Sequence, residues 1–179
     1  MDLTAVMKFT LAIQKAQVEI GKIYRELNSN TDETLEYLES NKEEYFVPVE
    51  VAADTFSAFA RAEQRRFNTI DKNITAARSV IEEMLKDSDS DKLTAFSDAV
   101  EYMADENYTH HNIFVEAVKP YRAFIDTCVD GIPRDTMLDI FMSLSRLSRS
   151  NLQLTVGCFK KVNKAYEDLT GTDEKSSTI

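Results

Sequence analysis

The feature that most constrains the fold of this chain is an apolar stripe between about Val49 and Leu85. The members of the stripe fall three or four positions apart: Phe56, Ala60, Phe67, Ile70, Ile74, Ala77, Ile81 and Met84. This spacing places them on one face of an α-helix, as in a coiled coil or a helical bundle. Because such a helix is not stable alone in water, we expect other helices of the chain to cover the stripe.

Turn-forming residues are scarce, with four glycines and three prolines among 179 residues. A sheet protein needs such residues at short intervals, so the chain is predicted to be all-α. The hydrophobic share of 43% and the charged share of 29% are ordinary for a soluble globular protein. The length is sufficient for a single domain with a real core.

Further stripes extend this prediction to the whole chain. Four long helical arms are expected, over residues 3–27, 49–86, 91–129 and 133–170. Short connections favour antiparallel neighbours, so we expect an up-down four-helix bundle. Residues 1–171 would form this single domain, and the polar tail over 172–179 is expected to be disordered.

The pattern also predicts several interruptions. Asn28–Thr31 breaks the first arm, so a separate short helix is expected over about Asp32–Tyr45, lying across one end of the bundle. Asn107–Thr109 interrupts the third arm, and Pro120 predicts a kink in it. Asp130–Pro133 is the clearest stop signal, because glycine suits the end of a helix and proline suits the first turn of the next.

The charge of the chain indicates what it binds. The formal net charge of −10 disfavours nucleic acid and anionic lipid and suits a basic protein partner. Acidic residues crowd the predicted short helix: Glu33, Glu36, Glu39, Glu43 and Glu44. We therefore expect a non-enzymatic protein-protein interaction module, such as an adaptor, chaperone, immunity protein, inhibitor or assembly subunit. Its docking face would be an acidic surface built from residues 32–45 and 82–106.

Cysteine content and hydropathy bear on the compartment. Cys128 and Cys158 are the only cysteines, and both lie in apolar helical context, which is typical of reduced core thiols; one disulfide remains an alternative. No apolar run approaches the roughly 20 residues that span a bilayer. The first ten residues lack the pattern of a secretory signal, so we expect a cytoplasmic protein.

Glu63 stands on the apolar stripe of the second arm, where an unpaired charge would be costly. The preferred interpretation is that the stripe frays there and Glu63 reaches water or an adjacent arginine. The alternative is a polar layer that fixes helix register or binds a ligand. The stripe of the last arm drifts near Ser148–Asn151. If the polar layer binds a ligand, the alternative function is a small-ligand or anion sensor. Its pocket would lie between the arms near Glu63, Tyr121, Arg146 and Arg149.

The metal-binding potential of the chain is weak. Glu106 and His110 are four apart and share a helix face, with His111 beside them. A di-metal bundle needs carboxylates from all four helices, but the last arm has no Asp, Glu or His between Ile140 and Tyr166. A metal-dependent bundle enzyme is therefore the least favoured alternative. We predict no metal, no cofactor and no catalytic residues.

The first arm carries more apolar residues than one stripe requires. Met7, Leu11 and Val18 widen its apolar face. Self-association through this arm into a homo-oligomer is therefore a further expectation.

Overall fold

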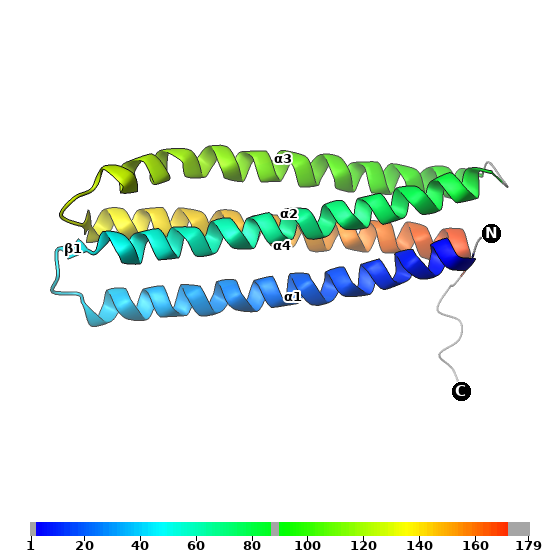
Figure 1. Ribbon diagram of the computed structural model, residues 1–179. Coiled ribbons are helices and arrows are strands. Elements are labelled where there is room, and N and C mark those ends of the chain that lie inside the picture. Colours follow the sequence, from blue (N-terminus) through cyan, green and yellow to red (C-terminus); the bar gives the residue numbers. More distant parts are fainter. Residues whose placement is uncertain (1–2, 87–89, 172–179) are drawn as a thin grey trace, which may run out of the picture.

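The computed structural model describes residues 3–86 and 90–171, and the predicted tail over 172–179 lies outside them. Four long helices run alternately up and down the molecule (Figure 1). Their bounds are α1 Leu3–Ser40, α2 Val49–Leu85, α3 Asp91–Thr127 and α4 Arg134–Thr170. The all-α prediction is confirmed. The last three helices begin and end within two residues of the predicted arms.

The expected short fifth helix does not exist as a separate element, because α1 continues without a break to Ser40. Thr31 is buried, and its hydroxyl donates to the backbone oxygen of Leu27 at 2.7 Å, which keeps it within the helix. The hydroxyl of Thr34 lies 3.4 Å from that of Thr55 on α2. Packing against α2 thus overrides the weak helix propensity of this polar segment. The sequence also has no glycine or proline between residues 22 and 47 that would break the helix near Thr31.

The predicted interruption at Asn107–Thr109 is also wrong, since α3 is continuous there. Asn107 is buried, and its side-chain amide donates to the backbone oxygen of Phe67 on α2 at 3.3 Å. Pro120 lies inside α3 without ending it. Ser90 caps the start of α3 by accepting from the backbone N–H of Leu93 at 3.2 Å.

A short β-clip joins the two connections at one end of the bundle, and the sequence pattern did not predict it. Strand β1 (Phe46–Val47) pairs antiparallel with β2 (Ile132–Pro133), placing Phe46 opposite Pro133 and Val47 opposite Ile132. Gly131 precedes β2 with φ +113°, and a Cβ there would come within 2.9 Å of the Val47 backbone oxygen. Glycine is therefore required where the two connections meet.

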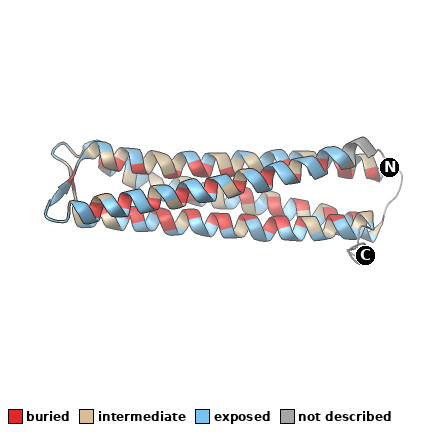
Figure 2. Cartoon of the chain, turned by 90° about the horizontal axis from the view of Figure 1, so that it is seen from below, coloured by how far each residue is buried: buried red, intermediate tan, exposed pale blue. Residues whose placement is uncertain are grey.

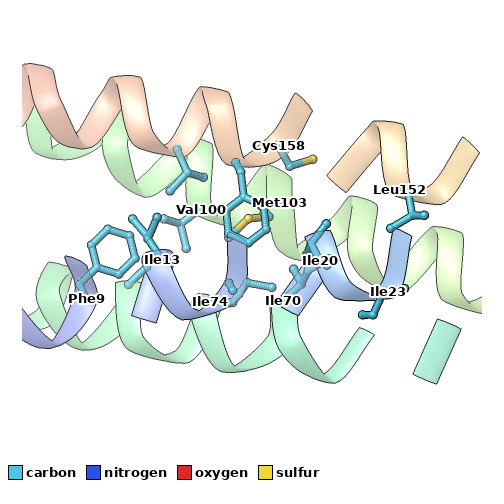
Figure 3. Close-up of a cluster of buried hydrophobic side chains, with 14 of the residues drawn as sticks. Phe9, Ile13, Ile20, Ile23, Ile70, Ile74, Val100, Met103, Leu152 and Cys158 are labelled. Atoms are coloured by element: carbon cyan, nitrogen blue, oxygen red, sulfur yellow. The ribbon is translucent and has the colours of Figure 1, made fainter. Parts of the chain in front are cut away.

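The core fills the centre of the bundle along its length. Buried faces turn toward the bundle axis, whereas the connections at the β-clip are largely exposed (Figure 2). Near the start of α1, Phe9 packs edge-on against Phe96 and Tyr166, with ring centroids 5.6 and 4.9 Å away. Isoleucines of α1 and α2 continue this core toward the middle (Figure 3). A smaller cluster that includes Val47 and Ile132 seals the β-clip end.

Candidate functional site

Acidic side chains gather at the end of the bundle that holds the β-clip. We define this clip end as residues 32–54 and 120–139, which are the last turns of α1 and α3, the first turns of α2 and α4, and the two connections between them. It contains twelve acidic and three basic side chains, so it carries −9 of the net charge of −10. All twelve carboxylates are exposed. The rest of the chain is close to neutral, and the charge of the molecule is therefore polarised toward one end.

These carboxylates have no cationic partners within the part of the chain that the structure describes. The ion pairs of the described residues involve other carboxylates, such as Glu19, Glu83 and Glu101. Arg134, the half-buried basic residue of the clip end, donates instead to the backbone oxygen of Leu38 at 2.8 Å. The negative potential of the clip end is therefore not cancelled internally.

Large apolar side chains are exposed at the same end. Tyr45 is 73% exposed and packs edge-on against Phe46, with ring centroids 4.9 Å apart. Val129, in the other connection, is 88% exposed. Exposed aromatic residues with charged residues around them are typical of protein-protein interfaces. The clip end thus combines an anionic rim with apolar anchors.

The predicted partner-binding residues all lie at the clip end, but the predicted acidic surface is not one surface. Glu33, Glu36 and Glu39 lie on the last turns of α1, followed by Glu43 and Glu44 in the connection. The described residues of the other segment, 82–86 and 90–106, run from the opposite end of the bundle toward its middle (Figure 1). Because α1 and α2 are antiparallel and α1 is longer than expected, these two segments cannot form a common face. The second half of the acidic end comes instead from residues 120–139.

A buried polar layer crosses the bundle at the level of Glu63. Glu63 and Arg66 of α2 are each 3% exposed, and the guanidinium donates to both carboxylate oxygens at 2.6 and 2.9 Å. Arg66 also donates to Asn107 of α3 and to Thr155 of α4, each at 3.1 Å. Asn151 of α4 donates to Glu63 at 3.1 Å. The interpretation that Glu63 reaches water is wrong, and its arginine partner is Arg66.

This layer is filled by its own side chains. The cavity beside Arg66 and Asn151 has a volume of about 10 Å³, close to the space of one water molecule and far below that of a metabolite. The Glu63–Arg66 ion pair of α2 also hydrogen-bonds to side chains of α3 and α4, which is the arrangement expected of a polar layer that sets the register of these helices. Of the residues that pair in the layer, the sequence analysis named Glu63 as a polar-layer candidate and missed Arg66 and Asn151. The drift of the apolar stripe near Ser148–Asn151 is the signal that could have found Asn151.

The residues of the predicted ligand pocket differ in burial, with Glu63 in the interior and the two arginines at the surface. Arg146 and Arg149 are exposed on α4, and Tyr121 is partly buried against the core on α3. Among the described residues, none of these three side chains forms a hydrogen bond or ion pair with Glu63. Arg149 lines a different cavity, a groove between α1 and α4 with a volume of about 690 Å³. The structure therefore separates Glu63 from the exposed arginines.

The two histidines lie in the middle of α3 and not near a helix start. His110 Nδ1 lies 3.1 Å from a carboxylate oxygen of Glu106, and His111 Nδ1 lies 3.3 Å from Glu63. The ring of His111 stacks on Phe67 at a centroid distance of 4.2 Å. Across the described part of the chain, no three His, Cys, Asp or Glu side chains come together as metal ligands would.

Cys128 and Cys158 are free thiols. Burial raises the pKa of Cys158, the more enclosed of the two, which disfavours its reactive thiolate form. Within residues 3–86 and 90–171, none of the helices combines the length and apolar character that crossing a bilayer requires.

The comparisons with known proteins add no relative. No protein-family model matches the chain, and neither a curated protein nor a solved structure gives a significant match.

Proposed function

We propose that this protein is a non-enzymatic interaction module that docks a basic partner protein on the clip end. The observation that carries the proposal is the set of twelve exposed carboxylates that lack cationic partners among the described residues. Long-range attraction from such a surface raises the association rate of a basic partner. The exposed Tyr45, Phe46 and Val129 supply apolar contacts that retain the partner after encounter.

The buried charged residues, Glu63 and Arg66, support a structural role for the interior. Glu63 and Arg66 pair with each other deep in the bundle, where a substrate cannot reach them. The small cavity beside them argues against the small-ligand or anion sensor at that position. Adaptor, chaperone, inhibitor and assembly roles all use a docking face of the proposed kind, and a cytoplasmic setting is part of the same proposal.

Affinity capture from the native cell followed by mass spectrometry tests the proposal. The chain is compared with a triple variant of the clip end, Glu36→Lys, Glu39→Lys and Glu43→Lys. We expect the wild-type chain to capture a stoichiometric partner with a basic surface and the triple variant to lose it, because like charges repel across the interface.

A matched control makes the same change of charge at the opposite end of the bundle, with Glu82→Lys, Asp98→Lys and Glu167→Lys. These three residues are exposed, like those of the clip end. The control should still capture the partner. Retention of the partner by the clip-end variant, or equal loss from both variants, would reject the clip end as the docking face.

Self-association through α1 belongs to the same proposal as a second interaction. Met7, Leu11 and Val18 are all at least half exposed, and their spacing places them along one side of the helix. Sedimentation velocity of the wild-type chain and of a Leu11→Glu, Val18→Glu variant tests it. A wild-type dimer that becomes monomeric in the variant supports this interaction, and a monomeric wild-type chain rejects it.

A further inference from the structure

A second surface, a groove between α1 and α4, is lined by basic side chains, whereas the clip end is acidic. The groove between α1 and α4, with its volume of about 690 Å³, lies beside the buried core. Leu152 and Phe159 of α4 contribute buried apolar side chains to it. Tyr24 of α1 and Val156 of α4 also line it and are 52% and 45% exposed. Large apolar side chains are thus exposed along a groove that already reaches the core, which is typical of a docking site.

The charged residues that line the groove are all positive. Arg149 and Lys160 line it from α4, and both are exposed. No acidic residue occurs in α4 between Asp139 and Glu167. The two acidic residues at the matching level of α1 are Glu19 and Glu26, and both pair with Arg65 on α2 instead. The groove therefore favours an anionic occupant with an apolar face.

From these observations we propose that the groove docks an amphipathic α-helix of a partner protein, whose apolar stripe is bordered by Asp and Glu. The lining of α4 runs from Arg149 to Asn163, about 21 Å along the helix, which corresponds to roughly four turns of a docked helix. Residues three and four apart on that helix would contact Tyr24 and Val156. Acidic residues about eleven positions apart would reach Arg149 and Lys160, because these two lie about 16 Å apart along α4.

The charge of the groove argues against self-docking of two copies through it. A symmetric dimer would place Arg149 and Lys160 of one copy near those of the other, and such like-charge contacts are unfavourable. The groove also lies on a different part of the molecule from the clip end and selects the opposite charge. This inference is therefore independent of the proposed function.

Two synthetic peptides test the inference directly. Both are 16-residue helices with the same leucine stripe; one has glutamates beside the stripe and the other has lysines. Fluorescence anisotropy with the full chain should show that the acidic peptide binds at least about tenfold more tightly than the basic one. Backbone amide NMR shifts should concentrate on α1 residues 17–24 and α4 residues 149–163. Equal binding of both peptides, no binding of the acidic one, or shifts centred elsewhere would overturn the inference.

Two neighbouring lysines provide a matched pair of variants. Lys160 lines the groove, whereas Lys161 lies over the ring of Tyr102 on α3, 3.9 Å from its centroid. Lys160→Glu should weaken the acidic peptide at least about tenfold, and Lys161→Glu should leave its affinity within about twofold. Equal effects of the two variants would show that net charge, and not the groove, determines binding.

A third variant fills the groove without changing its charge. Gly21 lines it, and a Cβ at this position would meet only the guanidinium of Arg25, at 3.8 Å. Gly21→Leu should therefore fold and reduce binding of the acidic peptide. Circular dichroism confirms the fold. Unchanged peptide affinity in a folded Gly21→Leu protein would contradict docking in this groove. The clip-end triple variant is a control: its changes lie outside the groove, so it should still bind the acidic peptide.

Discussion

The buried polar layer and the clip end use the same kinds of side chain in opposite ways. In the layer, Glu63 and Arg66 are each 3% exposed, and their polar atoms contact α2, α3 and α4. At the clip end, twelve carboxylates are exposed, and the described chain supplies none of them with a cationic partner. The difference separates charges that determine how the helices pack from charges that remain available to another molecule.

The comparison makes a testable distinction between stability and binding. Changes in the layer should alter the free energy of unfolding, because a charge left unpaired in the interior is costly. Changes at the clip end should alter association and leave folding nearly unaffected, because exposed charges remain hydrated.

Arg66→Ala should lower the free energy of unfolding by about 3–5 kcal/mol, because it leaves Glu63 buried without its ion-pair partner. Urea denaturation followed by circular dichroism measures the change. The control is Arg65→Ala, which removes a partly exposed arginine paired with Glu19 and Glu26. This control should cost less than about 1 kcal/mol. A loss for Arg66→Ala as small as that of the control would contradict a structural role of the layer.

Gly131→Ala should destabilise the β-clip by about 1–3 kcal/mol, because the residue has φ +113° and a Cβ would crowd the Val47 backbone oxygen. Gly157→Ala is the control: its Cβ would meet nothing within 4 Å in the middle of α4. That change should stabilise the protein by up to about 1 kcal/mol. The same urea titration checks both. A neutral Gly131→Ala would show that the two connections need no close approach.

Glu101 is an intermediate case, since it is exposed but paired with Arg78 at 2.6 Å. The hydrogen bond from Arg78 lowers the pKa of Glu101. A lowered pKa contributes stability above the unfolded-state pKa, and that contribution is lost as the pH falls through the folded-state pKa. Glu101→Gln should therefore cost about 0.2–1 kcal/mol at pH 7, and the difference should shrink toward pH 3. A difference that is constant with pH would contradict the pairing.

Glu36→Gln, Glu39→Gln and Glu43→Gln together should change the free energy of unfolding by less than about 0.5 kcal/mol. Relief of repulsion between neighbouring glutamates on α1 would make any change slightly favourable. Thermal unfolding at low ionic strength measures it. A large destabilisation would mean that these carboxylates have structural partners and would weaken the case for a docking face.

The sequence pattern predicted the parts of the fold that depend on repeated apolar spacing. The stripe from Phe56 to Met84 placed α2, and further stripes together with the stop signal at Asp130–Pro133 placed α3 and α4. Local breaks were misjudged where tertiary packing dominates. Thr31 and Asn107 have low helix propensity, but burial against α2 and hydrogen bonds keep both in continuous helices.

The candidate sites were harder to predict, because they depend on which distant residues meet. The five glutamates from Glu33 to Glu44 were identified from local charge, but the antiparallel course of α1 and α2 separates them from residues 82–106. Arg66, Asn107 and Asn151 come from three helices, and spacing within one helix does not reveal their common level. Two-residue strands such as β1 and β2 leave no periodic signal.

The most direct test of the central claim is the dissociation constant for the captured partner, measured at low and at physiological salt. The measurement compares the wild-type chain with two triple variants. The clip-end triple changes Glu36, Glu39 and Glu43 to Lys, and the opposite-end triple changes Glu82, Asp98 and Glu167 to Lys. We predict at least about tenfold weaker binding for the clip-end triple, with little remaining salt dependence, and near wild-type binding for the other. Equal affinities for the two triples would contradict docking at the clip end.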